Sequence, residues 1–415
     1  MVREVLAGAS TFITMAYLFI LYPSLLSEAG FPFEAAFNAT ILVSIASTLA
    51  VGLYARFPVA VAPGLAVGAY LVYSVILDGN TPKDGALGMV FWVGFALFFL
   101  SLCKARQKII HTMPVTIRNA AIGGMGLFLI CIAAKDLGLI NKGSQGIFAF
   151  HTFGTIEQGV AAFGLAIFWI LHFFQSRFAF IASVACSFAL SIGLGLTHID
   201  KWIDLPSLQH LFLTTPNLTF PLQTNCMEAL LTMLLIALFD TSASLIALGQ
   251  YGGHMNQQGQ VQGIDKIVLV DSVGSMTGSF FGTGTVTFLL ESIAGLKAGG
   301  RGPWTAITIA ALSTGSLFLY PLLATIPHYA TSFLLVAIGG FMLGACRQIP
   351  WRKWSDALPA AAILITIPLT FSIYKGLAAG FVLFVLCKTM AQEKDALHPL
   401  VIGLSTLFIF HYFIF

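Results

Sequence analysis

Long apolar runs recur along almost the whole chain, and they constrain its fold more than any other feature of the sequence. Most are close to the ~20 residues that a helix needs to cross the hydrocarbon core of a bilayer, and each is bounded by charge, proline or glycine. Fourteen segments are expected at 6–27, 36–54, 58–77, 86–103, 116–134, 157–174, 178–196, 228–249, 265–281, 283–296, 303–325, 329–346, 357–372 and 375–390, with a last apolar stretch at 397–415. The sequence therefore predicts an all-α polytopic membrane protein.

The composition leaves little room for anything else. Of the 415 residues, 58% are hydrophobic and only 9% are charged, whereas soluble domains carry roughly 25% charged residues. The basic start and apolar run of the N-terminus resemble a signal peptide, but that run has the length of a full span and many more follow, so we interpret it as an uncleaved first helix. The six cysteines occur singly, which indicates packing residues and neither a metal site nor a disulfide framework.

The distribution of basic residues supports the segment count. With the N-terminus in the cytoplasm and every segment crossing once, fifteen of the twenty Lys and Arg residues fall on the cytoplasmic side. This is the asymmetry expected from the positive-inside rule, and one miscounted segment would remove it. We therefore predict a multi-pass protein of the plasma membrane, the inner membrane of a bacterium, with a cytoplasmic N-terminus.

The third and tenth segments break the helical pattern. "FPVAVAPGLAVGAYLVYSVI" (57–76) carries two prolines before Gly64 and Gly68, and "GSFFGTGTVTFLLESIAG" (278–295) carries three glycines before the β-branched Thr285. Each is predicted to be an extended stretch that enters a half-length helix. Because seven segments separate the two, the halves would have opposite orientations in the membrane, and interrupted segments at corresponding positions of inverted halves are typical of a transporter's binding site.

This symmetry predicts the domain organisation. The first inverted repeat, with segments one to seven, is expected at 1–196, and an outer connecting loop at 197–227. The second repeat, with segments eight to fourteen, is expected at 228–390. A C-terminal hydrophobic tail follows at 391–415.

Two carboxylates lie inside apolar segments, where a charge costs about 2.5–3.5 kcal/mol on insertion scales. Asp240 lies within "LLIALFDTSASLIALG" and Glu291 within the interrupted tenth segment, and no intramembrane Lys or Arg is expected to pair with them. Ionised carboxylates accept hydrogen bonds, and the start of a half-helix offers backbone N–H donors. Acceptors beside donors suit a heterocycle with N–H and C=O groups on its edge, and they suit an inorganic anion poorly.

Five blocks resemble the bacterial and fungal hypoxanthine/guanine/adenine permeases, a branch of the nucleobase–cation symporter family. They are "EVLAGASTFITMAYLFILYPSLLSEAG", "APGLAVGAY", "LFDTSASLIA", "DSVGSMTGSFFGTGTVTFLLESIAGLKAGGRGPWTA" and "IPLTFSIYKGLAAGF". The resemblance implies a seven-plus-seven inverted-repeat fold, with a core of segments 1–4 and 8–11 and a gate of segments 5–7 and 12–14. It also implies proton-driven uptake of purine bases, which bind between core and gate.

Carried over by position, the resemblance implies that Asp240 and Glu291 are the acidic site residues and candidates for proton coupling. The full candidate set for substrate binding is Glu291, Asp240, Thr241, Ser244, Gly68, Gly64, Thr285, Ser292 and Phe288. Phe288 is included as a ring that could stack on a bound base.

The sequence departs from the family pattern at several of these positions. A second aspartate, one turn before Asp240, is replaced by Ala237, and an asparagine of the third segment is replaced by Gly68. The family's "GTSTVTTY" is "GTGTVTFL" here, so Gly284 and Phe288 replace hydroxyl side chains. We therefore expect altered or relaxed selectivity among bases.

The leading hypothesis is a proton-coupled importer of hypoxanthine, guanine, adenine or a related base. The alternatives are a transporter of the same architecture for a pyrimidine base, xanthine or an inorganic anion such as sulfate or bicarbonate, then a channel, then a membrane enzyme. The expected partners are the small-molecule base and the lipid bilayer, without nucleic acid, and a homodimer remains an open alternative. No cofactor or metal is expected, with the proton as the coupling ion.

Overall fold

The computed structural model describes residues 1–142, 148–150, 154–199, 201–204, 215–222, 226–253, 255, 261–393 and 398–414. The predicted connecting loop at 197–227 lies largely outside the described residues. The chain divides into two compact units, Met1–Lys104 with Gly154–Leu334 and Ala105–Phe153 with Leu335–Phe415. In this division, segments six and seven fall into the same unit as segments one to four, and the core and gate stay a prediction.

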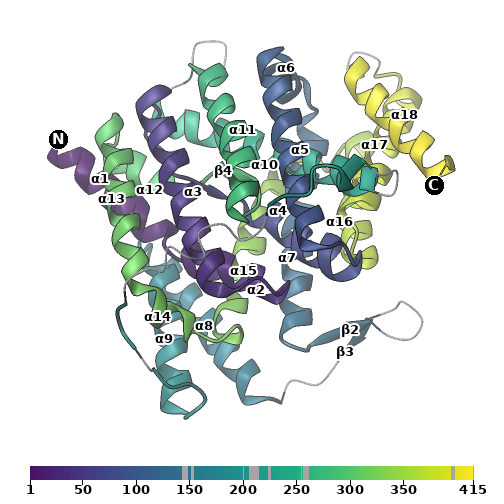
Figure 1. Cartoon of the computed structure of the whole chain (residues 1–415). Coiled ribbons are helices and arrows are strands. Elements are labelled where there is room, and N and C mark those ends of the chain that lie inside the picture. The colour runs from purple at the N-terminus through teal and green to yellow at the C-terminus, as the bar shows by residue number, and fades with distance from the viewer. Residues whose placement is uncertain are drawn as a thin grey trace. The chain divides into compact units, whose positions relative to one another are not determined.

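The first unit is helical apart from two short strands (Figure 1). Its helices are α1 (Val2–Met15), α2 (Leu18–Glu28), α3 (Phe33–Tyr54), α4 (Leu65–Ala69), the π-helix η1 (Tyr70–Asp78), α5 (Lys83–Leu102), α8 (Ile156–Phe173), α9 (Ala179–Gly193), the short 3-10 helix η3 (Phe220–Leu222), α10 (Met227–Gly252), α11 (Ile264–Phe281), α12 (Ser292–Lys297), α13 (Pro303–Ser316), the 3-10 helix η5 (Leu317–Leu319), α14 (Tyr320–Ala324) and the start of α15 (Tyr329–Leu343). Its strands are β1 (Val61–Pro63) and β4 (Val286–Phe288).

The second unit contains fewer elements. They are α6 (Ala105–Thr112), α7 (Val115–Asp136), the strands β2 (Ile140–Lys142) and β3 (Phe148–Phe150), the end of α15, the 3-10 helix η6 (Gly344–Gln348), α16 (Trp354–Thr370), α17 (Ile373–Met390) and α18 (Pro399–Ile414). β2 and β3 form an antiparallel pair. α7, α16 and α17 pack on one another, and α18 packs on α17.

The helices follow the predicted segments closely. Within the described residues, nine helices are long and apolar enough to cross a membrane, and four further apolar helices are shorter. The predicted first segment is α1 followed by α2, and the predicted tail contains α18. The basic residues between the fourth and fifth segments, expected in a loop, instead belong partly to the short helix α6.

Both interrupted segments are extended where the sequence predicts it. β1 and β4 pair antiparallel, with Val61 opposite Phe288 and Pro63 opposite Val286. Prolines at 58 and 63 restrict the first stretch to extended backbone. In the second stretch, several glycines followed by β-branched residues disfavour a helix. After the pair, the chain continues through Gly64 into α4 and through Glu291 into α12.

Small residues allow the helices around this pair to pack closely. α13 lies against both α1 and α3 (Figure 1). A Cβ on Gly52 of α3 would lie 2.2 Å from the Ala306 Cβ of α13, and a Cβ on Gly8 of α1 would lie 2.7 Å from the Thr305 carbonyl oxygen. Larger side chains at these glycines would push the helices apart, which is why small residues are common at helix contacts inside membranes.

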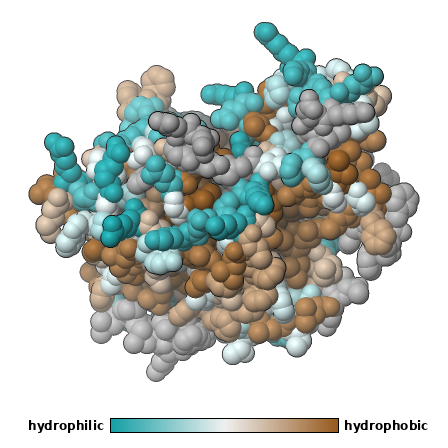
Figure 2. All heavy atoms as spheres, turned by 90° about the horizontal axis from the view of Figure 1, so that it is seen from above, coloured by the Kyte–Doolittle hydropathy of each residue, from teal (hydrophilic) through white to brown (hydrophobic). Residues whose placement is uncertain are grey.

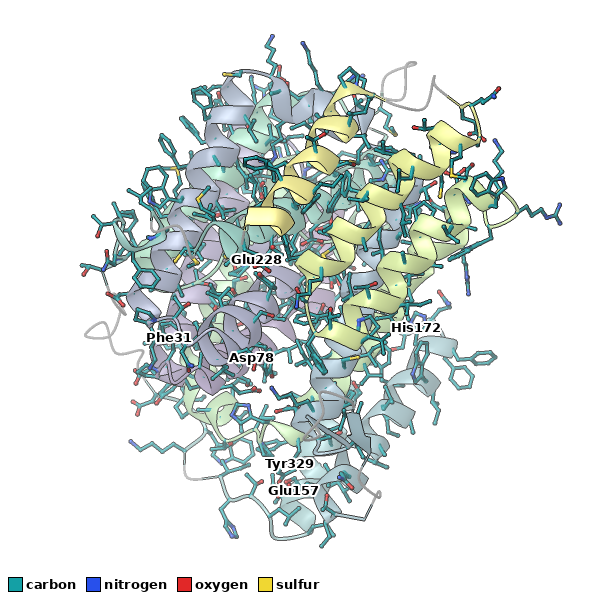
Figure 3. The ribbon with its side chains drawn as sticks, turned by 90° about the vertical axis from the view of Figure 1, so that its right-hand side faces the viewer. Phe31, Asp78, Glu157, His172, Glu228 and Tyr329 are labelled. Atoms are coloured by element: carbon teal, nitrogen blue, oxygen red, sulfur yellow. The ribbon has the colours of Figure 1, made fainter. Side chains whose placement is uncertain are left out.

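Several acidic residues lie at helix ends, as the sequence predicts. Asp78 ends η1, Glu157 lies in the first turn of α8 and Glu228 lies in the first turn of α10 (Figure 3). Figure 2 shows hydrophilic side chains gathered in patches on the face that is drawn, next to hydrophobic ones. This pattern is typical of helices whose apolar flanks face lipid and whose ends meet water.

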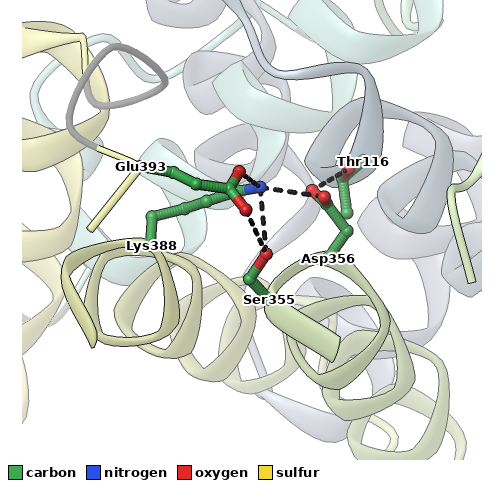
Figure 4. Close-up of polar contacts among 5 residues, drawn as sticks. All are labelled: Thr116, Ser355, Asp356, Lys388 and Glu393. Carbon is green, nitrogen blue, oxygen red and sulfur yellow. Dashed lines mark hydrogen bonds and ion pairs between the residues drawn. The ribbon is translucent and has the colours of Figure 1, made fainter. Parts of the chain in front are cut away.

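The second unit contains a buried ionic cluster (Figure 4). Lys388 Nζ lies 2.8 Å from Asp356 Oδ2 and 2.8 Å from Glu393 Oε2. Thr116 donates its hydroxyl to Asp356 Oδ1 at 2.7 Å, and the hydrogen bond from Lys388 lowers the pKa of Glu393 below its usual value. The cluster joins α7, α16 and α17, and its lysine lies near the end of the predicted segment 375–390.

Candidate functional site

The antiparallel pair of β1 and β4, called the β1–β4 crossing below, is the centre of the candidate site. Backbone hydrogen bonds join the two segments at both ends of the pair. The Gly64 N–H donates to the Thr285 carbonyl at 2.9 Å, and the Leu289 N–H donates to the Ala60 carbonyl at 3.1 Å. Outside the pair, the Ala60 N–H donates to Ser292 Oγ at 2.9 Å. Extended backbone inside a membrane requires such partners, because lipid offers none.

Asp240 lies against this crossing. A Cβ placed on Gly64 would be 3.3 Å from Asp240 Oδ2, and Thr287 of β4 lies beside the same carboxylate. The absence of a side chain at Gly64 therefore leaves the space that the carboxylate occupies. Asp240 remains half-buried, whereas Thr241 and Thr287 are buried.

Glu291 lies at the other end of β4, directly before α12. The Tyr17 hydroxyl donates to Glu291 Oε1 at 2.5 Å, and the Thr14 hydroxyl donates to the Glu291 carbonyl oxygen at 3.2 Å. The Tyr17 ring stacks on Phe180 of α9, with centroids 4.3 Å apart and planes 14° apart. The carboxylate is thus held by the first segment, and it is half-buried like Asp240.

The structure also locates the other candidates. Thr241 donates its hydroxyl to Asp271 Oδ2 at 3.4 Å, and Ser244 is buried on α10. Ser292 accepts the Ala60 N–H, as described above. Phe288 is buried in β4 opposite Val61.

Thr285 differs from these residues in its hydrogen bonding. Its carbonyl accepts from Gly64, but its buried hydroxyl oxygen has no hydrogen-bond partner in the described part of the chain. A buried hydroxyl without a partner costs about 1–3 kcal/mol. Such a group, one residue before β4, is available to a ligand.

Three further residues of this region do not emerge from the sequence analysis. Asp271 of α11 is fully buried, and its charge repels that of Asp240. Its sequence signal is its position about two turns inside α11 and within the predicted segment 265–281. Tyr17 and Tyr22 have no distinguishing sequence signal, because their roles arise from contacts with residues more than 260 positions away.

Gly68 and Gly284, where family side chains are missing, both lie against Tyr22. A Cβ on Gly68 would be 2.5 Å from Tyr22 Cε2, and a Cβ on Gly284 would be 2.3 Å from the Tyr22 hydroxyl oxygen. The departures from the family pattern therefore do not leave an empty space, because the phenol ring fills it.

Comparison with known proteins agrees with this fold and with the predicted resemblance. The Permease family matches residues 2–409. The guanine/hypoxanthine permease PbuO of Bacillus subtilis is 31% identical over 99% of this chain and 97% of its own length. The adenine permease AdeP of Escherichia coli is 29% identical over 98% of this chain and 91% of its own length.

Solved structures support the architecture. The transmembrane domain of the cyanobacterial bicarbonate transporter BicA matches with a TM-score of 0.66 over 91% of this chain and 96% of that domain, at 15% identity. The murine Solute Carrier 26 family member A9 anion transporter matches with a TM-score of 0.64 over 94% of this chain and 69% of its own. At such low identity these matches show the fold alone. The family match over nearly the full length, together with the relative PbuO, shows that the chain belongs to the Permease family and is a membrane permease, not an enzyme.

Proposed function

We propose that this permease imports purine nucleobases together with protons. The observation that carries the proposal is the pair of half-buried carboxylates, Asp240 and Glu291, on the two sides of the β1–β4 crossing. The names of the relatives PbuO and AdeP, which include guanine, hypoxanthine and adenine, support the substrate class.

The chemistry of the site agrees with a base as substrate. Purine bases present ring N–H groups that a carboxylate can accept. In the described part of the chain, the hydrogen bonds and ion pairs of the two acids include no lysine or arginine. An inorganic anion would meet repulsion from Asp240, Glu291 and Asp271, so the anion alternative is disfavoured here despite the shared fold.

The finer architecture belongs to the same proposal. We infer that fourteen segments cross the membrane as two inverted repeats, because β1 and β4 occupy corresponding places in the halves and pair antiparallel. The core-and-gate arrangement is what the family resemblance implies, and the cytoplasmic N-terminus follows from the positive-inside rule.

A proton provides the simplest coupling for such a site. Moving an ionised carboxylate through a dry barrier is costly. Protonation of Asp240 or Glu291 would neutralise the loaded site before it moves, and the base would then be released on the cytoplasmic side together with the proton.

Uptake measurements test this assignment. A host without its own purine uptake, expressing this chain, should accumulate at least one of radiolabelled hypoxanthine, guanine, adenine and xanthine, with uracil as the pyrimidine comparison. Glu291→Gln should abolish that uptake while the protein reaches the membrane at normal levels. Near-normal uptake by this variant would show that Glu291 is not part of the site.

A further inference from the structure

Tyr22 occupies a distinctive place between the two interrupted segments. It is fully buried on α2, and its ring fills the space beside Gly68 of α4 while its hydroxyl reaches Gly284. The Gly284 N–H donates to the Tyr22 hydroxyl oxygen at 3.0 Å, and Thr283 lies beside the same hydroxyl. The Tyr22 side chain therefore fills the space that side chains at positions 68 and 284 would otherwise occupy.

The space that Tyr22 fills lies next to Asp240 and the β1–β4 pair of the candidate site. Gly64 and Gly68 are four residues apart and share one face of α4, and the Gly68 N–H donates to the Gly64 carbonyl at 2.9 Å. Asp240 lies against Gly64 and Tyr22 lies against Gly68. The carboxylate and the phenol are thus successive neighbours along one helix face that carries no side chains of its own.

The second interrupted segment also has one residue beside Asp240 and another beside Tyr22. Thr287 lies beside Asp240, and Gly284 is bonded to Tyr22. Between them in the sequence lies Thr285, and its buried hydroxyl, like those of Thr283 and Thr287, has no hydrogen-bond partner in the described part of the chain. Polar hydroxyls without a partner thus accompany the stretch of chain that joins the neighbours of Tyr22 to those of Asp240.

Ordinary core packing is the simplest alternative explanation for Tyr22, since a buried tyrosine usually has a partner for its hydroxyl. Packing alone, however, does not explain why Tyr22 lies against a glycine in each of the two interrupted segments. A medium-sized side chain at 22 would pack equally well against side chains at 68 and 284.

We propose that Tyr22 sets the size and shape of the substrate site next to Asp240. Its ring closes the end of the site at Gly68, and its hydroxyl holds the backbone of Gly284 and so positions Thr285. The inference rests on the proposed function, because it identifies the residue that limits which bases this site accepts.

A mutational cycle tests whether residues 22 and 68 share one space. Gly68→Asn alone should lose most uptake and accumulate poorly, because its Cβ would lie 2.5 Å from Tyr22 Cε2. Combining it with Tyr22→Ala should restore both the protein level and uptake by at least tenfold over Gly68→Asn. Tyr374→Ala provides a matched control, because Tyr374 is a buried tyrosine of α17 in the other unit and should not rescue Gly68→Asn.

Selectivity is the readout that a packing role would not change. The probes are hypoxanthine and a set of singly methylated hypoxanthines, used as competitors of radiolabelled hypoxanthine uptake. Tyr22→Ala should improve inhibition by at least one methylated analogue about tenfold relative to hypoxanthine, because it opens the space beside Gly68. Tyr22→Phe keeps the ring and should preserve the ranking of competitors.

An unchanged ranking in Tyr22→Ala, together with no rescue of Gly68→Asn, would overturn the inference. If Tyr22→Ala does not accumulate, Tyr22→Leu removes less volume and is judged by the same ranking. A failure of the proposed function is distinguishable, because the wild type would then transport no purine base. The rescue of Gly68→Asn could still be measured by protein level and thermal unfolding.

Discussion

At the scale of single residues, the contact between Tyr17 and Glu291 links the first segment directly to the interrupted tenth segment. The hydroxyl holds one carboxylate oxygen at 2.5 Å, and the ring is fixed by stacking on Phe180. The orientation of Glu291 therefore depends on a residue in the turn between α1 and α2.

Tyr17→Phe removes this hydrogen bond and keeps the stacked ring. Hydrogen bonds to charged groups contribute about 1.5–3 kcal/mol, so we expect uptake of the preferred base at low concentration to fall about tenfold or more. Uptake and surface level should be measured together, with Tyr374→Phe as the control variant. Wild-type uptake by Tyr17→Phe would show that Glu291 is oriented without the phenol.

The sequence predicts some of these residues and not others, for physical reasons. Asp240 and Glu291 can be predicted because a carboxylate in an apolar segment is costly wherever its partners lie. Tyr17 and Tyr22 cannot, because tyrosine is common in apolar segments and their roles depend on pairing between distant parts of the chain. Gly68 is an intermediate case: the sequence shows a missing side chain, and only the structure shows that Tyr22 fills its place.

At the scale of elements, hydropathy and backbone preferences are sufficient to predict most of the fold. Apolar length predicts the helices, and proline with glycine predicts the two extended stretches that become β1 and β4. The ionic cluster of α7, α16 and α17 is not predictable in this way. Lys388 follows an apolar run and so resembles a residue of a solvated loop, yet its side chain is 4% exposed and contacts Asp356.

Lys388→Ala should destabilise the second unit. It would leave the buried Asp356 carboxylate without its cation, and breaking a buried ion pair by removing one partner typically costs about 3–5 kcal/mol. Thermal unfolding of the solubilised protein should show a clearly lower midpoint.

Lys375→Ala serves as the control for this change, because Lys375 is an exposed lysine at the start of the same helix. Exposed substitutions usually change stability by less than about 0.5 kcal/mol. Equal unfolding midpoints for the two lysine variants would show that the ionic cluster contributes nothing to stability.

At the scale of the whole molecule, the protein is a permease whose proposed driving force is the proton gradient. The candidate coupling groups are the same carboxylates that are proposed to contact the base. Substrate binding and protonation would therefore occur at one place, and no separate ion site is required.

This proposal predicts how uptake responds to ions. Uptake should rise as the external pH falls, since more of the coupling carboxylate is then protonated at the outer side, and a protonophore should abolish accumulation. Replacing sodium with choline should have no effect. A sodium requirement would overturn proton coupling and leave the assignment as a permease intact.

The pairing of β1 with β4 also affects how the protein is made. Ala60 and Ser292, which are bonded beside this pair, are 232 residues apart in the chain. The first extended stretch is synthesised long before its partner, and contacts between distant parts of a chain form late and slowly. Until residue 292 has entered the membrane, the backbone of β1 lacks these partners and must be protected by water or by the insertion machinery. The first half of the chain thus depends on the second to complete its folding.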